Sequence, residues 1–148
     1  MAIKIQFDSQ NKVKTDTEDG TLTQASVAGK IRWGDFRFKA GLDSQSTGFK
    51  EPTKDYQTTN INAGVTFSWT PWVFGMNFQN SSQNYKNPDL ATNVVLKNKK
   101  DEITVNSKYA YSRSSIVGAD LKQIKQSSND VFRTYSENQV LLQYMWLF

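Results

Sequence analysis

The sequence predicts an all-β protein, an antiparallel up-and-down sheet of about eight strands that closes into a barrel and forms a single domain over residues 1–148. Three observations lead to this prediction. Apolar and polar residues alternate with a period of two along most of the chain. Short and long connections follow one another strictly, and no segment keeps the 3.6-residue period of an amphipathic helix.

The expected strands are recognised by their alternating positions. In the segment 24–33, for example, Val27, Ile31 and Trp33 fall on one face, whereas Lys30 and Arg32 fall on the other. The segment 115–126 alternates weakly. The predicted strands span residues 3–8, 24–33, 36–43, 60–69, 72–79, 103–112, 115–126 and 139–148.

The connections between these strands differ in length. Tight turns are expected at Gly34, Pro71 and Ser114, and all three prolines fall in connections, where a missing N–H does no harm. The basic run 97–100 is expected to be a solvated part of a loop. The long polar connections are predicted at 10–21, 45–57, 84–100 and 126–134.

Composition excludes several function classes. The chain contains no cysteine and no histidine, so it can form neither a catalytic triad with histidine nor a cysteine or histidine metal site. Asp89, Asp101 and Glu102 do not have the spacing of a calcium loop. The net charge of +4 comes without a nucleic-acid-binding motif. We therefore expect no enzyme, no cofactor, no metal site and no nucleic-acid partner.

The mean hydropathy is −0.63, and no stretch approaches about 18 consecutive apolar residues, so no transmembrane helix is predicted. Strands that cross a membrane are half polar, and averaged hydropathy does not exclude them. Alternation alone does not decide whether the apolar face points inward, as in a soluble carrier, or outward toward lipid.

Aromatic residues favour the outward orientation. Each of the four tryptophans flanks a predicted short turn or lies near the C-terminus. In a barrel with an even number of strands these places share one rim, and tryptophan and tyrosine favour the boundary between membrane and water. The predicted interface aromatics are Trp33, Phe36, Trp69, Trp72, Tyr111, Tyr144, Trp146 and Phe148.

The polar face also favours this orientation, because it contains charges that a water-excluded core would not accept unpaired. Its carboxylates are expected to pair with nearby cations rather than to act in catalysis. The residues predicted to line a lumen are Lys30, Arg32, Arg37, Lys39, Asp43, Asn60, Asn62, Asn77, Asn106, Lys108, Asp120 and Glu137, and Lys4, Asp8 and Lys122 share their face.

The last nine residues, 140–148, end on phenylalanine and have aromatic or apolar residues at every second position before it. This ending resembles the C-terminal assembly signal of bacterial outer-membrane β-barrel proteins, although Leu147 stands where that signal usually has a polar residue. The resemblance implies a transmembrane β-barrel in the outer membrane of a Gram-negative bacterium, in contact with lipid and lipopolysaccharide. It also implies assembly by the barrel-assembly machinery through the C-terminal strand, and export by a signal peptide that this sequence does not contain.

Several functions remain open at this point. The barrel could form a small passage for ions or polar solutes, biased toward anions by Lys30, Arg32, Arg37 and Lys39. Eight strands leave room only for side chains, so a wide passage requires a larger barrel, made by oligomerisation or by a longer protein of which this is the C-terminal part. Alternatively, a non-conducting barrel could bind a partner or surface through its loops, where Phe49, Tyr56, Tyr85 and Phe132 lie. A soluble lipocalin-like carrier is a further alternative.

Overall fold

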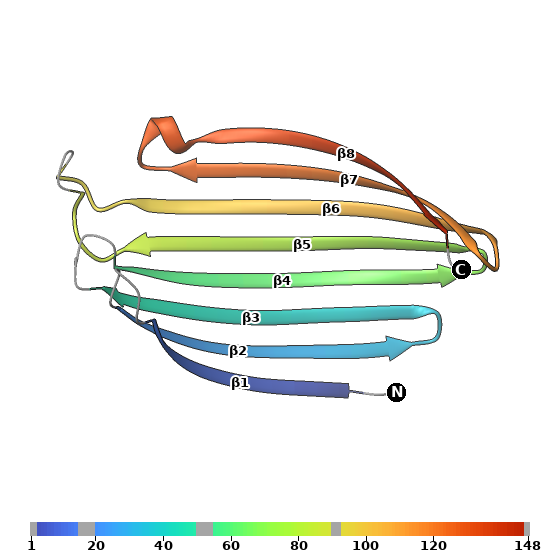
Figure 1. Ribbon diagram of the computed structural model, residues 1–148, viewed down its shortest axis with the longest axis horizontal. Helices are drawn as coiled ribbons and strands as arrows, with labels where there is room; N and C mark the ends of the chain where they lie inside the picture. The colour runs from blue at the N-terminus through green and yellow to red at the C-terminus, as the bar shows by residue number, and fades with distance from the viewer. Residues whose placement is uncertain (1–2, 15–19, 50–54, 90–92, 147–148) are drawn as a thin grey trace.

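The structure, a computed structural model, is one antiparallel sheet of eight strands that follow each other in sequence order (Figure 1). It describes residues 3–14, 20–49, 55–89 and 93–146, and for 3–14, 20–22 and 49 it describes the backbone alone. The all-β, up-and-down prediction is confirmed. The strands are β1 (Ile3–Lys14), β2 (Gly20–Trp33), β3 (Phe36–Phe49), β4 (Tyr56–Trp69), β5 (Trp72–Tyr85), β6 (Lys97–Ser112), β7 (Ser115–Ser128) and β8 (Tyr135–Trp146).

The strands extend further into the predicted long connections than the alternation indicates. Thr58 and Thr59 of β4, for example, are paired with Gln83 and Ser82 of β5, although both faces are polar there. The basic run 97–100, predicted as a loop, begins β6. Backbone hydrogen bonds continue the ladder beyond the point where apolar residues mark it, and hydrophobic alternation therefore underestimates strand length.

The three tight turns lie where the sequence predicts them. Gly34 connects β2 to β3 with φ +59°, a left-handed conformation that glycine adopts at no steric cost. The expectation of no helix needs one small correction, because a 3₁₀ turn, η2 (Val131–Arg133), precedes β8. The Asp130 carboxylate accepts the backbone N–H of Phe132 at 3.0 Å and so caps this turn.

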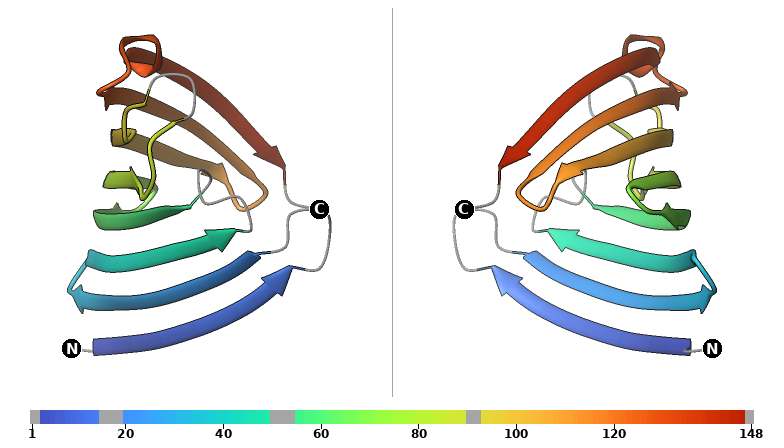
Figure 2. Two further views of the ribbon diagram at one scale, coloured as in Figure 1. Left: turned by 90° about the vertical axis from the view of Figure 1, so that its left-hand side faces the viewer. Right: turned by 90° about the vertical axis from the view of Figure 1, so that its right-hand side faces the viewer.

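The described strands do not close into the predicted eight-stranded barrel. β1 and β8 lie at opposite edges of the sheet and are not paired with each other. Figure 2 shows that the sheet is twisted and curled into an open trough. Closing eight strands requires strong curvature from bulges and glycine kinks. Among the described pairings a single register shift occurs, between Ala110 and Ser112.

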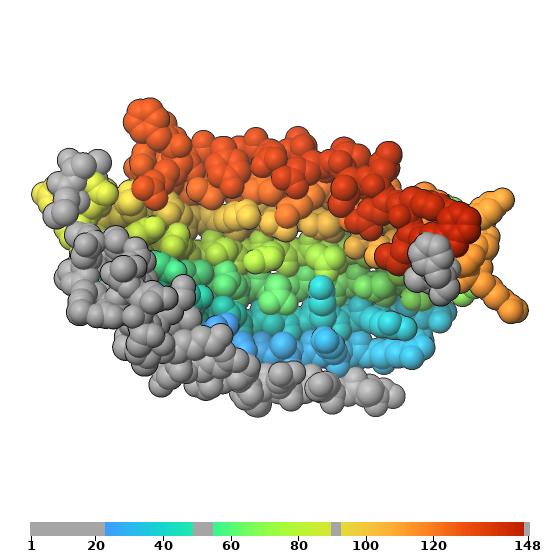
Figure 3. All heavy atoms as spheres, viewed as in Figure 1, coloured from blue at the N-terminus to red at the C-terminus, as the bar shows by residue number. Residues whose placement is uncertain are grey.

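No second layer of the described chain covers the sheet. In the space-filling view of Figure 3, which has the orientation of Figure 1, the atoms of β2 to β8 remain visible as neighbouring coloured stripes. In the described residues the buried hydrophobic side chains are Leu96 and Ile124, and both lie near the end of the sheet that holds the long connections. The molecule therefore has two exposed sheet faces rather than an internal core.

Glycines open space on the polar face for asparagine side chains of neighbouring strands. Gly64 is opposite Asn77, and Gly75 is opposite Asn106. A Cβ on Gly64 would lie 2.5 Å from Asn77 Oδ1, and a Cβ on Gly75 would overlap Asn106 Oδ1. Gly41 stands in the same relation to Asn62. These amides thus lie over the backbone of the adjacent strand.

We predict that Gly75→Ala lowers the free energy of unfolding by about 1–3 kcal/mol, because the new methyl group displaces the Asn106 amide. Urea unfolding of the detergent-solubilised protein measures the change. Gly29→Ala is the matched control, since a Cβ there meets nothing within 4 Å, and its effect should stay within about 0.5 kcal/mol. Equal losses in both variants would contradict the packing described here.

Candidate functional site

The two faces of the sheet differ sharply in polarity. One face, the apolar face, exposes large hydrophobic side chains on β2 to β8; on β8 these include Val140 at 70% and Leu142 at 78% relative exposure. The other face, the polar face, presents charged and amide side chains. The exposed hydrophobic residues of the apolar face include Val27, Ile31, Trp33, Phe36, Phe38, Leu42, Ile61, Trp69, Phe74, Met76, Phe78, Ile103, Val105, Val117, Leu121, Val140, Leu142, Tyr144 and Trp146.

The predicted lumen residues share the polar face, and the pairing register brings many of them next to each other. Lys30 is opposite Lys39, Arg32 is opposite Arg37, and Asp43 is opposite Asn60. Asn106 is opposite Asp120 in the next part of the sheet. The remaining ones, Asn62, Asn77, Lys108 and Glu137, pair with Gly41, Gly64, Gly118 and Ile124.

Asp43 is the centre of a hydrogen-bond network across three strands. Its carboxylate accepts Gln24 Nε2 of β2 at 2.8 Å and Asn60 Nδ2 of β4 at 3.0 Å. Among the described residues, neutral amides rather than the predicted cations bind both of its oxygens. Sequence reasoning missed Gln24, although its alternating position in β2 places it on the same face.

Asp120 has a similar arrangement at the other side of the sheet. Its Oδ2 accepts Gln143 Nε2 of β8 at 2.9 Å, and its Oδ1 is buried without a hydrogen-bond partner among the described residues. Glu137, in contrast, is exposed and accepts Gln139 Nε2 at 2.8 Å. The acidic residues of the polar face are thus held mainly by amide donors.

Among the described side chains of this face, Glu102 is the carboxylate that pairs with cations. Its carboxylate lies 2.9 Å from Lys122 Nζ and 3.4 Å from Lys100 Nζ. Glu102 lies just before the predicted strand 103–112, whereas the observed β6 already begins at Lys97 and contains it. The alternation of side chains could have indicated this pairing, because Lys100 and Glu102 occupy even-numbered positions, as Thr104 and Asn106 do on the same face.

Four cations gather at the end of the polar face that holds the short turns. Lys30, Arg32, Arg37 and Lys39 line a cavity of about 420 Å³ together with Thr66, Ile31 and Phe38. All four cationic residues are exposed. Arg32 Nε donates to the carbonyl of Gly34 at 3.4 Å, and the ion pairs of the described residues all lie elsewhere. We call these four residues the basic cluster.

Lys39 connects the basic cluster to a second polar cavity. A Cβ on Gly64 would lie 2.6 Å from Lys39 Cε, so the lysine chain runs across the floor of the sheet over β4. The second cavity, of about 370 Å³, is lined by Lys39, Asp43, Asn60, Asn62, Asn77, Gln79, Glu102 and Thr104. A polar path therefore runs from the basic cluster toward the long connections.

The predicted interface aromatics gather at the short-turn end of the apolar face. Trp33 is opposite Phe36, and Trp69 is opposite Trp72. The centroids of the Trp72 ring and the Tyr109 ring lie 4.7 Å apart. Tyr111 is 77% exposed, and Tyr144 contacts Trp146 edge to face. Phe148, the last of the predicted set, lies outside the described residues, as do the side chains of Lys4 and Asp8.

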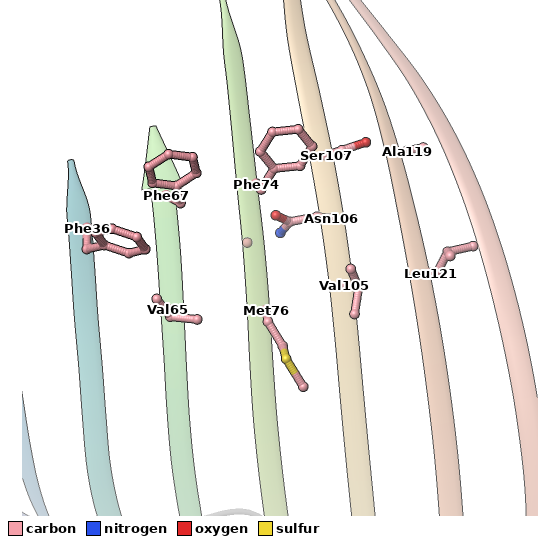
Figure 4. A pocket seen from close by; sticks show the side chains of 11 residues that line it. Phe36, Val65, Phe67, Phe74, Met76, Val105, Asn106, Ser107, Ala119 and Leu121 are labelled. Atoms are coloured by element: carbon pink, nitrogen blue, oxygen red, sulfur yellow. The ribbon is translucent and has the colours of Figure 1, made fainter. Parts of the chain in front are cut away.

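A shallow groove of about 330 Å³ crosses the apolar face next to these aromatics (Figure 4). Its floor is low because Ser107 and Ala119 are small, and Phe67, Phe74 and Leu121 rise at its sides. The stacked rings of Phe36 and Phe67, with centroids 4.8 Å apart, form one wall. This groove is open and almost entirely apolar.

The aromatics predicted near the loops have different positions. Tyr56 and Tyr85 face each other at the ends of β4 and β5, with ring centroids 5.9 Å apart. They are half-buried, which favours a role in packing over the predicted role in contact with a partner. Phe132 in η2 is fully exposed, and the side chain of Phe49 is outside the described residues.

Comparison of the chain with protein-family models, with curated proteins and with solved structures gives no match. Among the described segments none is a helix long and apolar enough to cross a lipid bilayer. In the same part of the chain no group of three or more acidic side chains comes together in a way that could hold a metal ion.

We predict a measurable coupling between Glu102 and Lys122. The pair is partly shielded, with side-chain exposures of 19% and 32%, so a double-mutant cycle with Glu102→Gln and Lys122→Gln should give about 0.5–1 kcal/mol. Urea unfolding in detergent provides the four free energies.

The control cycle uses Lys99 and Asp101, which lie 3.8 Å apart and are more exposed. Solvent screens this pair, and its coupling should be close to zero. Additive effects at Glu102 and Lys122 would show that their ion pair does not stabilise the sheet.

Proposed function

We propose that this protein forms the wall of a bacterial outer-membrane β-barrel, with its apolar face against lipid and its polar face lining a passage for ions and small polar solutes. The observation that supports this most strongly is the contrast between the two uncovered faces, one of which gathers most of the exposed large hydrophobic side chains. A contiguous apolar surface of this extent in water would promote aggregation, whereas in a bilayer it is matched by acyl chains.

The dimensions of the apolar face agree with a bilayer. On β4 the alternating apolar positions run from Ile61 to Trp69. At about 3.3 Å per residue these eight steps cover roughly 26 Å along the strand. A tilted strand of about 9–11 residues crosses a hydrocarbon core, and aromatic residues mark its boundary. The pairs Trp33–Phe36 and Trp69–Trp72 lie at the end of this apolar span, as expected for an interfacial girdle.

The open edges favour a barrel larger than eight strands. In hydrocarbon every backbone N–H and C=O must be paired, so the outer edges of β1 and β8 require further strands. A second copy or another part of a longer protein could supply them. A wider barrel also leaves a water-filled lumen, which eight strands alone would not. The edge of β8 is where we expect the assembly machinery to bind, in keeping with the terminal aromatic pattern.

The composition of the polar face supports transport rather than catalysis. Amides and hydroxyls such as Asn60, Asn62 and Asn77 line the second cavity and can hydrate a moving solute. The basic cluster faces the same space and carries no compensating carboxylate among the described residues. Cations that line a passage favour anions. The proposed passage is therefore anion-selective.

Loop-mediated binding is the second candidate, and one observation favours it. Val131 and Phe132 are 81% and 100% exposed on the tip of η2. Asp130 fixes this turn through the backbone of Phe132 and through Arg133 Nε at 3.2 Å. A rigid turn that presents two hydrophobic side chains to solvent is suited to contact with a partner. A soluble carrier is disfavoured, because it should bury its large apolar side chains, whereas those of this sheet are exposed.

Conductance in planar bilayers tests the proposed passage. The reconstituted protein should give a steady ionic current, with a reversal potential in a salt gradient that indicates anion preference. Arg32→Glu combined with Arg37→Glu should shift the selectivity toward cations, because both residues line the cavity of the basic cluster.

The control variant is Arg113→Glu, an exposed residue in the turn between β6 and β7 and outside this cavity. Its selectivity should match that of the parent protein. A silent bilayer with correctly folded protein would contradict the passage and leave loop-mediated binding as the remaining candidate.

A further inference from the structure

The basic cluster is an unusual arrangement for a β-sheet. Lys30 faces Lys39 and Arg32 faces Arg37 across the same pair of strands. Side chains directly opposite each other have Cβ atoms about 5 Å apart, and like charges in this position destabilise the sheet. Two such pairs in succession therefore imply that something outside the described residues compensates the charge.

Among the described residues none forms an ion pair with these four cations. Asp43, on the same face of β3, follows Lys39 by four residues, about 13 Å along the strand. Its oxygens already accept hydrogen bonds from Gln24 and Asn60. Apart from the bond from Arg32 Nε to the Gly34 carbonyl, the described contacts leave the guanidinium and ammonium groups free to bind a ligand.

The space in front of these groups is large enough for a small ligand. The cavity of about 420 Å³ contains all four cations and the Thr66 side chain, which adds a hydroxyl donor. Lys39 borders this space from the side of β4, because its chain lies over Gly64 with Cε beside this glycine. The cavity is therefore bounded by donors from three strands, β2, β3 and β4.

We propose that the basic cluster is a binding site for a tetrahedral, doubly charged oxyanion, either inorganic phosphate or the phosphate group of a monoester. Two adjacent guanidinium groups offer paired donors that match the oxygens of such a group, and two lysines add charge. The pairs lie about 7 Å apart along the strands, a spacing that suits one phosphate group better than an extended polyanion. This inference deepens the proposed passage and rests on it, since the anion reaches the site from the lumen.

The site is expected to discriminate by charge and geometry. Chloride carries one charge and has no set of oxygens that matches the paired guanidinium donors. It therefore gains less from these groups than phosphate does. Sulfate shares the charge and shape of phosphate and should bind comparably. A hydrogen bond to a charged group contributes about 1.5–3 kcal/mol, which corresponds to roughly tenfold or more in affinity.

Isothermal titration of the folded, detergent-solubilised protein with inorganic phosphate tests the site, at constant ionic strength and about pH 8, where phosphate groups carry close to two charges. Saturable phosphate binding at least about tenfold tighter than chloride binding is expected. Arg32→Gln combined with Arg37→Gln should weaken phosphate binding by about tenfold or more.

Two further variants separate the site from a general charge effect. Arg113→Gln combined with Lys125→Gln removes the same net charge from two exposed positions outside the cavity, and phosphate affinity should change by less than about twofold. Arg32→Lys combined with Arg37→Lys keeps the charge but loses the paired donors, and should give an intermediate affinity.

The inference would be overturned if phosphate binding were not saturable or if chloride bound with equal affinity. It would also be overturned if the two glutamine double variants lost phosphate affinity equally. Full phosphate affinity in the lysine variant would overturn it as well, because it would show that charge alone suffices. The titration does not depend on conductance. A conducting protein that binds no phosphate would retain the proposed passage, and a phosphate-binding protein that is silent in bilayers would lose it.

Discussion

A single-layer sheet leaves both of its faces in contact with the surroundings, and in this protein the two faces have opposite polarity. Most globular domains resolve this by packing a second layer over the apolar face. Here no described element does so, and side chains such as Leu121 and Leu142 remain more than half exposed. Under the proposed function, the apolar face contacts lipid and the polar face contacts water.

The sequence predicts the strands well where this contrast between the faces is expressed as alternation. In β4, for example, Ile61 to Trp69 alternate without interruption, and the structure has the strand there. The sequence predicts the strands less well where the two faces of the sheet have similar polarity. Residues such as Thr58 and Ser82 have polar neighbours on both faces, so only their backbone pairing shows that they belong to strands. For the same reason Lys100 and Glu102 looked like loop residues, although they form the charged contact with Lys122.

The candidate site was predictable in its membership but not in its contacts. The alternation within each strand places Asp43, Asn60 and Arg37 on one face. It does not indicate that Asp43 binds Gln24 rather than a cation. Which residues meet across strands depends on register, and register depends on where each turn begins and ends. Closure was not predictable either, because local alternation contains no information on curvature. The open edges of β1 and β8 are a property of the whole sheet.

The polar face combines tight local packing with unbalanced charge. Gly41, Gly64 and Gly75 have no side chain, so asparagine amides of the neighbouring strands lie flat over the backbone. This leaves space above the polar face. Asp43 and Asp120 are satisfied by amides, so they do not neutralise the basic cluster. A surface built in this way resists collapse and stays hydrated, which are the physical properties that a lined passage needs. The apolar groove beside Ser107 and Ala119 lies on the opposite face of the sheet.

The most direct test of this account is the orientation of the two faces in a lipid bilayer. The chain has no cysteine, so single cysteines at Val65, Met76 and Leu121 on one face, and at Asn62, Asn77 and Asp120 on the other, can each carry one spin label. In reconstituted protein, labels of the first set should be reached mainly by membrane-soluble oxygen, and labels of the second set mainly by a water-soluble nickel complex. The reverse pattern, or access of the nickel complex to both sets, would contradict the account.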